Sequence, residues 1–487
     1  MKLLTCFFPS FNRAGLGRKP LPEALRLARQ VRQLDALCLG HLETLLGHGL
    51  PHWLRHFKQP SGVNSRKRTF TPVLTFWTFL SQVLDPGGSC RRALSRVQAL
   101  CALKGHATLS DSTAAYCNAR ARLSSRMLIR VLRHVTEAVQ AAARGLSGEG
   151  RLLVMDGTVL TLPDSGANRR VYSYASGQQP GCGFPQMHLL GLFDLRSGAW
   201  LRVVKSAARR HDSALAWKLV GFLREGDTLV ADRAFCSYAF IAELRTRGVQ
   251  VVMRLHQRRE ADMNQGKRLG KADRLQTWTK PLQCPKAMNA ARHAALPETL
   301  SVRIIATQVA VRGHRPEAML LATTLSDPKA HSAATIAALY LRRWEVELFF
   351  DDIKTSQHMD TLRCQSPDML AREVLMHMIA HNLVRMLMVQ ADKRRAPGEA
   401  GRLSFKGTLD RINQWHGTLW GCTSVRQATG RYEQLLQLIA EDVVPTRLKR
   451  NEPRVVKRRR DSYQLMTQPR NVMRLLPAPP KHRKSAA

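Results

Sequence analysis

The spacing of hydrophobic residues along the chain first follows a helical period. From Leu21 to Gly145, apolar residues recur every three or four positions, which is typical of amphipathic helices that pack on one another. The helix with the most regular period begins after Ser124 and ends at Gly145. This pattern predicts an all-helical N-terminal domain over residues 1–148.

Short apolar runs replace the helical pattern after Gly150. Leu152–Met155 is predicted to be a buried strand, and Met187–Asp194 with Trp200–Val204 is predicted to be a hairpin. Helices and strands then alternate over four segments: Ser213–Leu223, Thr228–Ala231, Tyr238–Thr246 and Val249–Leu255. Three strands followed by such an alternation indicate an α/β fold with a mixed sheet.

The pattern breaks down over residues 256–331. A basic, polar stretch, Gln257–Lys280, precedes two strand-like runs, Ser301–Val311 and Ala318–Leu325, so this part is predicted to be a β-rich insertion. Helical spacing resumes over two later segments, Ala333–Gln357 and Met369–Val389. The predicted α/β domain therefore consists of residues 149–255 and 332–390, and residues 391–487 form a basic C-terminal region.

Charge narrows the range of partners. The 487 residues carry 76 Lys and Arg against 36 Asp and Glu, a formal net charge of +40. Nucleic acid is the partner best able to balance such a surplus, and 44% hydrophobic residues exclude a merely disordered basic chain. The last stretch, Thr446–Ala487, contains Lys457, Arg458, Arg459 and Arg460, which we expect to contact phosphates rather than form an inert tail.

Hydropathy and cysteine spacing indicate the cellular compartment in which the protein is expected. No apolar run approaches the ~20 residues that a membrane span requires, so no membrane association is expected and the protein should be soluble and cytosolic. The ten Cys are scattered without a Cys-x-x-Cys pair. They are therefore interpreted as reduced thiols rather than as a zinc site or a disulfide framework.

Two acids follow predicted buried strands. Asp156 comes directly after Leu152–Met155, and Asp232 comes directly after Thr228–Ala231. A desolvated carboxylate is costly unless it is paired or bound to a metal, so two such acids at strand ends make a candidate site for a divalent cation. The alternative is that each acid caps a turn, since Asp-Gly is an ordinary turn sequence.

A third acid lies on the predicted helix Ala333–Gln357. Tyr340, Arg343, Glu347 and Lys354 are offset by 3, 7 and 14 residues, which at about 100° per residue places them on one stripe of the helix. Apolar neighbours flank this stripe, so it should lie at the edge of the packed surface, where a cleft would be. The alternative is a solvated face with an Arg343–Glu347 pair. His188 and His211 are interpreted as structural hydrogen-bonding residues.

The motif Tyr-x2-Arg-x3-Glu-x6-Lys, with one Asp on an early strand and Asp-Arg after a later one, resembles the signature of DDE transposases of bacterial insertion sequences, in the large family often called IS-four. Asp111–Arg120, the order of elements, and Arg454–Arg460 followed by Pro469-Arg470 are similar too, so the resemblance spans most of the chain. It implies an RNase H-like catalytic core that carries a β-rich insertion and follows a helical DNA-binding domain.

The resemblance implies a role for each residue of the motif. Asp156, Asp232 and Glu347 would be the catalytic, metal-binding triad for two Mg²⁺ ions, with Mn²⁺ as a substitute. Clustered carboxylates repel one another, and two ions about 3.5–4 Å apart relieve that repulsion while holding the attacking and leaving oxygens of a phosphodiester.

The remaining residues of the motif would contact DNA. Tyr340, Arg343 and Lys354 would hold phosphates beside the scissile bond, and Arg233 would act similarly. Trp278 in the insertion is a candidate for stacking on a flipped base, although a core or surface Trp is the commoner explanation.

The implied function is DNA transposition: binding of the terminal inverted repeats of an insertion sequence, hydrolysis of the phosphodiester at each end, and transfer of the 3′-hydroxyl into target DNA. Two ends must be held together, so a homodimer or larger synaptic complex on double-stranded DNA is expected, in the cytoplasm at the nucleoid. Two alternatives remain open. One is a metal-dependent nuclease or resolvase without strand transfer, and the other is a catalytically silent protein that binds DNA ends.

Overall fold

The structure is a computed structural model that describes residues 29–34, 69–103, 105–107, 109–143, 150–175, 181–207, 210–259, 261–309, 317–396, 401–422, 424–445, 466 and 468–475. The chain divides into two compact units. The smaller unit comprises Met1–Glu43, Gly47–Phe79 and Ser89–Leu123. The larger unit comprises Thr44–Leu46, Leu80–Gly88 and Ser124–Ala487.

The described part of the smaller unit is helical, as the apolar spacing predicts. It contains α5 (Cys90–Leu103), α6 (Ala114–Arg122) and the first residues of α4 (Pro72–Leu84). The buried residues of α5 recur at helical spacing: Ala93, Leu94, Val97, Leu100 and Cys101. On α6 the fully buried Tyr116 packs against the ring of Phe70, with ring centroids 5.5 Å apart.

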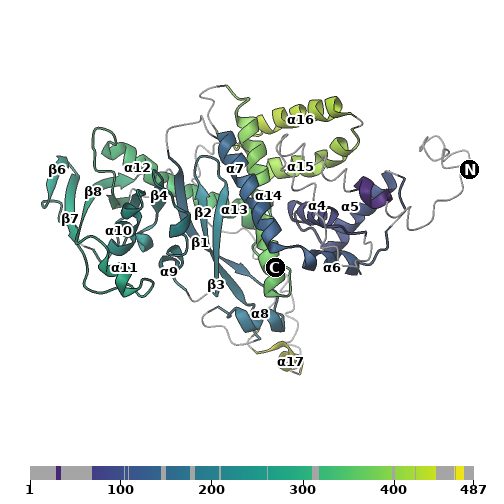
Figure 1. Ribbon diagram of the computed structural model, residues 1–487, viewed down its shortest axis with the longest axis horizontal. Helices are drawn as coiled ribbons and strands as arrows, with labels where there is room; N and C mark the ends of the chain where they lie inside the picture. The colour runs from purple at the N-terminus through teal and green to yellow at the C-terminus, as the bar shows by residue number, and fades with distance from the viewer. Residues whose placement is uncertain are drawn as a thin grey trace, which may run out of the picture. The chain divides into compact units, whose positions relative to one another are not determined.

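The larger unit is built on a mixed sheet that has nine strands among the described residues. The strands are β1 (Leu152–Thr161), β2 (Gln186–Asp194), β3 (Trp200–Ala207), β4 (Thr228–Ala231), β5 (Gln250–Arg254), β6 (Lys267–Gly270), β7 (Asp273–Thr279), β8 (Thr299–Val309) and β9 (Glu317–Thr323). Their order across the sheet is β3-β2-β1-β4-β5-β9-β8-β7-β6 (Figure 1). Among β1 to β5 only β2 runs in the opposite direction. This order and direction are those of an RNase H-like fold, so the predicted fold class is confirmed.

The insertion continues the core sheet instead of forming a separate one. β9 pairs antiparallel with β5, and β8, β7 and β6 follow outward. The sequence predicted two strands here, whereas the described residues of the insertion form four, together with the short helix α11 (Ala290–Ala294). The two missed strands, β6 and β7, lie in the basic stretch, where most residues are exposed or half-buried and apolar alternation is weak.

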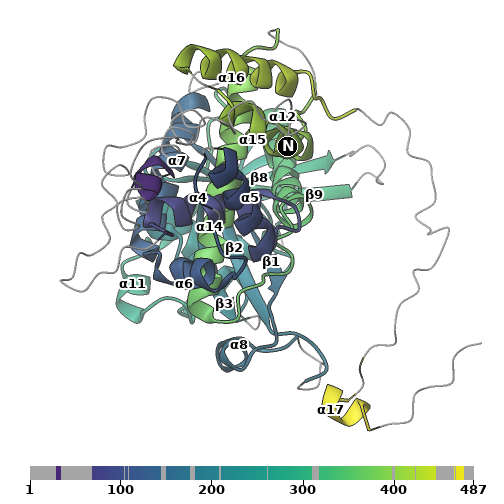
Figure 2. The same cartoon turned by 90° about the vertical axis from the view of Figure 1, so that its right-hand side faces the viewer.

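Helix α14 (Pro367–Asp392) is the central helix of the larger unit. It lies alongside α7 (Ser125–Ala143), and α15 (Phe405–Trp420) and α16 (Val425–Ala440) also pack on it (Figures 1 and 2). The fully buried Asn382 of α14 bonds both backbone groups of Trp200 at the start of β3, at 2.7 and 3.0 Å, and donates to Thr136 of α7 at 2.9 Å. One amide therefore ties two helices to the edge of the sheet.

Helix α14 corrects one expectation from the sequence. By length and composition it could cross a membrane, although no such run was expected. Its apolar stretch is 89% buried inside the protein, as in the core helix of a folded domain. Scattered polar residues such as His377, His381 and Asn382 interrupt the apolar run in the sequence, and in the structure these side chains are buried too.

The segment Ala333–Gln357 is predicted to be one helix, but its helical geometry changes along its length. It consists of α12 (Ala333–Leu341), a 3₁₀ turn (Arg342–Trp344), α13 (Glu345–Asp351) and a π turn (Asp352–Ser356). The other helices of the larger unit are α8 (Gly166–Val171), α9 (Asp212–Ala216), α10 (Tyr238–Thr246) and α17 (Arg470–Met473). Helix α9 is shorter than its predicted range, and a 3₁₀ turn (Val220–Phe222) follows it.

Candidate active site

Asp156 and Asp232 occupy equivalent positions on neighbouring parallel strands. The last parallel pair of β1 and β4 is Met155 with Ala231, and each acid is the next residue along its strand. Because neighbouring strands lie about 4.8 Å apart, the two acids share one edge of the parallel pairing. Asp232 directly follows the last residue of β4, as expected. Strand β1 continues past Asp156 to Thr161, however, because the hairpin partner β2 keeps pairing with it.

The Asp156 carboxylate is partly buried among charged groups. Its Oδ1 accepts a hydrogen bond from the Gly157 N–H at 2.8 Å, and its Oδ2 lies 3.6 Å from Nη1 of Arg343. Burial is the largest effect on the Asp156 carboxyl and raises its pKa, and the charges of Asp212 and Asp232 raise that pKa further. The Gly157 N–H and Arg343 lower it, but the net pKa lies above its usual range. A carboxyl in this state is stabilised as an anion by any added cation.

The polar stripe of the Ala333–Gln357 segment faces this edge of the sheet. Arg343 lies between two of the acids, since its guanidinium contacts both Asp156 and, at 3.2 Å, Glu347 Oε1. Lys354 Nζ lies 3.4 Å from Oγ1 of Thr158, which is two residues beyond Asp156 on β1. The stripe is therefore directed at β1, and Lys354 belongs to the π turn, a distortion often found at functional sites.

Tyr340 is the buried end of the stripe. Its side chain is only 3% exposed. Burial is the main cause that raises the pKa of its hydroxyl to about 12, the charge of Asp232 adds to the rise, and Arg343 opposes it. The hydroxyl is therefore a neutral donor near both Asp232 and Arg343. Glu347 is the opposite extreme, with a side chain that is 61% exposed.

The donor set suits a hard divalent cation. Carboxylate oxygens are the ligands that Mg²⁺ prefers, and the Arg343 guanidinium already places a positive group between Asp156 and Glu347. In the described part of the chain, however, no three acidic, His or Cys side chains are close enough to hold one metal ion.

Arg233 and Trp278 take no part in the contacts described above. Arg233 is exposed and begins the 3₁₀ turn directly after Asp232. Trp278 is only 5% exposed on β7, and the Arg259 guanidinium lies 3.9 Å from its ring centroid. Its ring is covered, which favours the alternative interpretation, a core Trp, over base stacking. Lys457, Arg458, Arg459 and Arg460 lie outside the described residues.

Asp212 is a fourth acid at this edge, and no pattern in the sequence singles it out. It is the first residue of α9, and its Oδ1 lies 2.7 Å from Nε2 of His188 on β2. The hydrogen bond to Asp212 is the main cause that raises the pKa of His188. An acid in the first turn of a helix is ordinary, so the sequence carried no signal beyond its position after the hairpin.

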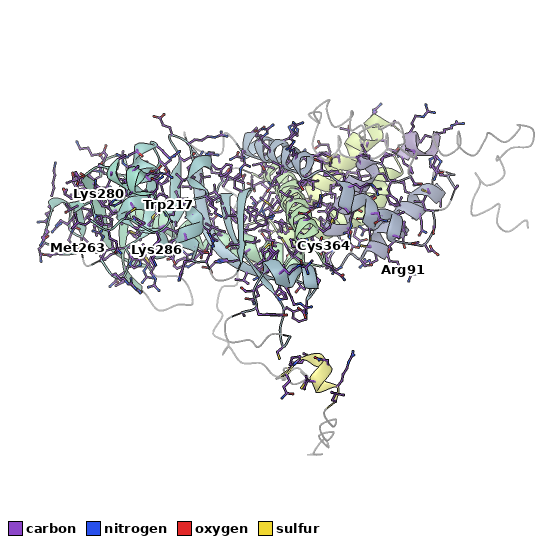
Figure 3. All side chains as sticks on the ribbon, turned by 60° about the horizontal axis from the view of Figure 1, so that its bottom comes forward. Arg91, Trp217, Met263, Lys280, Lys286 and Cys364 are labelled. Carbon is purple, nitrogen blue, oxygen red and sulfur yellow. The ribbon has the colours of Figure 1, made fainter. Side chains whose placement is uncertain are left out.

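A cavity of about 480 Å³ lies next to the turn that follows Asp232. Its walls come from α9, from that turn and from the insertion, and they include Trp217, Phe235 and Lys286. Figure 3 labels Trp217 and Lys286. The cavity combines basic and aromatic side chains.

Comparisons with known proteins bear on the family of this chain. Residues 147–383 match the family model described as transposase DDE domain. The chain is 22% identical over 408 residues to the transposase InsG for insertion sequence element IS4 of Escherichia coli (strain K12), a match that covers 82% of this chain and 88% of that protein. A solved structure, the piggyBac transposase synaptic complex with hairpin DNA, is similar with a TM-score of 0.41 and 10% identity, over 84% of this chain and 82% of that one.

Proposed function

Residues 147–383 form a transposase DDE domain, which belongs to a family of enzymes that catalyse DNA cleavage and joining, and from this premise we propose the substrate and the residues that act on it. The protein binds the terminal inverted repeats of its own insertion sequence. It hydrolyses the phosphodiester at each end and transfers the freed 3′-hydroxyl to target DNA.

The observation that carries this proposal is the position of Arg343. Its guanidinium contacts acids that are 191 residues apart in the sequence, Asp156 on β1 and Glu347 on α13. Asp232 lies at the same edge, one residue past the last β1–β4 pair. Asp156, Asp232 and Glu347 are therefore proposed to bind Mg²⁺, or Mn²⁺ in its place. When bound, two such ions would supply charge stabilisation for the attacking and leaving oxygens.

The neighbouring cations and the tyrosine hydroxyl suit phosphate groups. Arg343 offers a fork of N–H donors, Lys354 a compact charge and Tyr340 a neutral hydroxyl, so together they can fix a phosphodiester and neutralise charge that develops on it. Arg233, exposed directly after Asp232, is proposed to contact the adjoining phosphate. Phosphoryl transfer needs little more from a protein than positioning and charge stabilisation.

The remaining parts of the chain are proposed to bind DNA. Residues 1–148 would form the end-binding domain, with 149–255 and 332–390 as the catalytic domain and 256–331 as its insertion. The basic region 391–487, including Lys457 to Arg460, would contact DNA or the partner subunit. Two ends must be brought together, so a dimer or larger assembly acts on DNA in the cytoplasm.

The test uses the full-length protein and DNA that carries the element's own ends. Glu347→Gln should abolish Mg²⁺-dependent cleavage, and also joining from precut ends, while DNA binding is kept. Glu345→Gln is the matched control, because Glu345 lies on the same helix and pairs instead with Arg342. This control should retain activity.

Each outcome separates the proposal from its alternatives. Cleavage that is equal in the wild type and in Glu347→Gln would refute the catalytic assignment. Cleavage without joining from precut ends would identify a nuclease or resolvase. Binding to authentic ends without any cleavage in the wild type would identify a silent end-binding protein.

A further inference from the structure

Three contacts link His188 to Asp156 across the edge of the sheet. His188 Nε2 on β2 lies 2.7 Å from Asp212 Oδ1, while its Nδ1 lies 2.9 Å from the carbonyl oxygen of Arg210. The Asp212 carboxylate packs against Gly157 on β1. The Gly157 N–H in turn donates to the Asp156 carboxylate at 2.8 Å.

Gly157 leaves the space that Asp212 occupies. A Cβ atom built at position 157 would lie 2.4 and 2.5 Å from the two carboxylate oxygens of Asp212, closer than any side chain tolerates. The carboxylate can therefore approach β1 only because residue 157 has no side chain. The 2.7 Å contact with His188 Nε2 holds it there, and the His188 side chain is only 13% exposed.

The sheet does not need this contact between His188 and Asp212 to hold β1 and β2 together. The two strands pair continuously from Leu153 with Asp194 to Thr161 with Gln186, and His188 lies within that ladder opposite Val159. A negative charge held close to another carboxylate is unfavourable in the absence of a cation. The arrangement is accordingly better explained by a requirement of the site than by stability of the strands.

We propose that His188 and Asp212 are a positioning pair for Asp156, which fixes its backbone and adds negative charge beside it, and thereby sets how tightly the site binds divalent cations. This inference rests on the proposed function, in which Asp156 is a metal ligand. Residues behind a metal ligand typically change metal affinity by about 10- to 100-fold when they are mutated.

The experiment measures Mn²⁺ binding to the full-length protein without DNA, from the loss of the free-ion electron paramagnetic resonance signal. Asp212→Asn, which keeps the shape and removes the charge, should weaken binding by about 10- to 100-fold. His188→Leu should weaken it as well, whereas His188→Gln should bind more like the wild type because its amide can still donate to Asp212.

Asp164→Asn is the matched control. The Asp164 side chain is 29% exposed, as is that of Asp212, and it also pairs with a basic residue, Arg169. Asp164 lies beyond Thr161, the far end of β1, which is about 16 Å past Asp156 along the strand at ~3.3 Å per residue. Removal of the Asp164 charge should leave the Mn²⁺ affinity unchanged.

A second measurement separates positioning from general damage. In end cleavage, Asp212→Asn should raise the Mg²⁺ concentration needed for half-maximal rate more than it lowers the rate at saturating Mg²⁺. A merely structural role would lower the maximal rate without that shift. Gly157→Ala displaces the Asp212 carboxylate while leaving His188 and Asp212 in the sequence. This variant should also raise the required Mg²⁺ concentration. It tests the positioning role if Asp212→Asn does not fold.

The outcome for Asp156→Asn distinguishes this inference from the proposed function. If Asp156→Asn loses Mn²⁺ binding while Asp212→Asn and Gly157→Ala bind as the wild type does, the positioning pair is refuted and the proposed function stands. If Asp156→Asn itself binds Mn²⁺ as the wild type does, the proposed metal site is wrong, and the inference about Asp212 fails with it.

Discussion

At the residue scale, the role proposed for Arg343 in end cleavage can be separated by experiment from the effect of its charge on DNA binding. Its side chain is only 12% exposed and contacts both Asp156 and Glu347, so it is held in the site before DNA arrives. Arg343→Ala removes a preorganised donor, and the loss of one such donor typically costs about 10²-fold in rate. End cleavage should fall by about that factor, while non-specific DNA binding, measured by fluorescence anisotropy, should change much less.

Arg342→Ala provides the control for charge. Arg342 is the preceding residue, and it pairs with Glu345 and with the carbonyl of Leu195 instead of with the acids of the site. Both variants lose one positive charge, so their effects on non-specific binding should match. Equal losses of cleavage in the two variants would contradict the role proposed for Arg343.

The ion pair of Arg303 and Asp273 is a second residue-scale feature, inside the insertion. Arg303 is fully buried, donates to Asp273 at 2.9 Å, and also donates to the carbonyls of Leu325 and His331. Asp273→Asn leaves this buried cation without its counter-charge, which should destabilise the protein by about 3–5 kcal/mol in urea unfolding.

A surface pair in the same insertion shows the contrast. Lys280 pairs with Glu298, whose side chain is 79% exposed. Glu298→Gln should therefore change stability by at most about 1 kcal/mol. Similar losses for Asp273→Asn and Glu298→Gln would show that burial of the Arg303 pair has no energetic consequence.

The acids of the candidate site differ in how far the sequence reveals them. Asp156 and Asp232 follow apolar runs, and Glu347 lies on a helical stripe with two cations, so local pattern makes them candidates, and the family resemblance then selects them over the turn and solvated-face alternatives. Asp212 has no such pattern, because its meaning comes from the missing side chain of Gly157 and from His188 on another strand. Contacts of that kind depend on tertiary structure.

At the scale of elements, the segment that carries Tyr340 to Lys354 departs from ideal helix arithmetic and still presents one face. A 3₁₀ turn and a π turn change the residues per turn in opposite directions on either side of α13. The buried side chains of Val346, Phe349 and Ile353 anchor the opposite side of the segment. Burial therefore keeps the polar stripe on the site, and periodicity alone predicted the stripe but not the turns.

Two buried histidines of helix α14 are expected to make the stability of the protein sensitive to acid. His377 and His381 are buried, and burial is the main cause that lowers the pKa of each to about 3; nearby Arg363 and Arg385 respectively add to the effect. Both histidines are therefore neutral in the folded protein. Their stabilising effect is full above the unfolded pKa near 6.5 and is lost as the pH falls below it.

The free energy of unfolding should decrease by about 1.4 kcal/mol per pH unit for each of these histidines as the pH is lowered from about 6.5. Urea unfolding at pH 8, 6 and 5 measures this slope. His377→Gln should lessen it, whereas His358→Asn, at an exposed position with a φ of 53° that Asn tolerates, should not. An unchanged slope in His377→Gln would refute the assignment.

At the scale of the whole molecule, the net charge of +40 should govern DNA affinity. Each Lys or Arg that neutralises a phosphate releases counterions, so the logarithm of the affinity should fall linearly with the logarithm of salt concentration, by ~0.9 for each phosphate contact.

Substitution of Arg458, Arg459 and Arg460 by Gln should lower that slope by about 2.7 if all three contact phosphates. The reduction should be alike for terminal-repeat and unrelated DNA, since a phosphate contact carries no sequence information. Filter-binding titrations from 50 to 300 mM salt measure both slopes. A loss confined to terminal-repeat DNA would instead assign these arginines to base recognition, and a flat salt response in the wild type would remove the basic surface as the source of affinity.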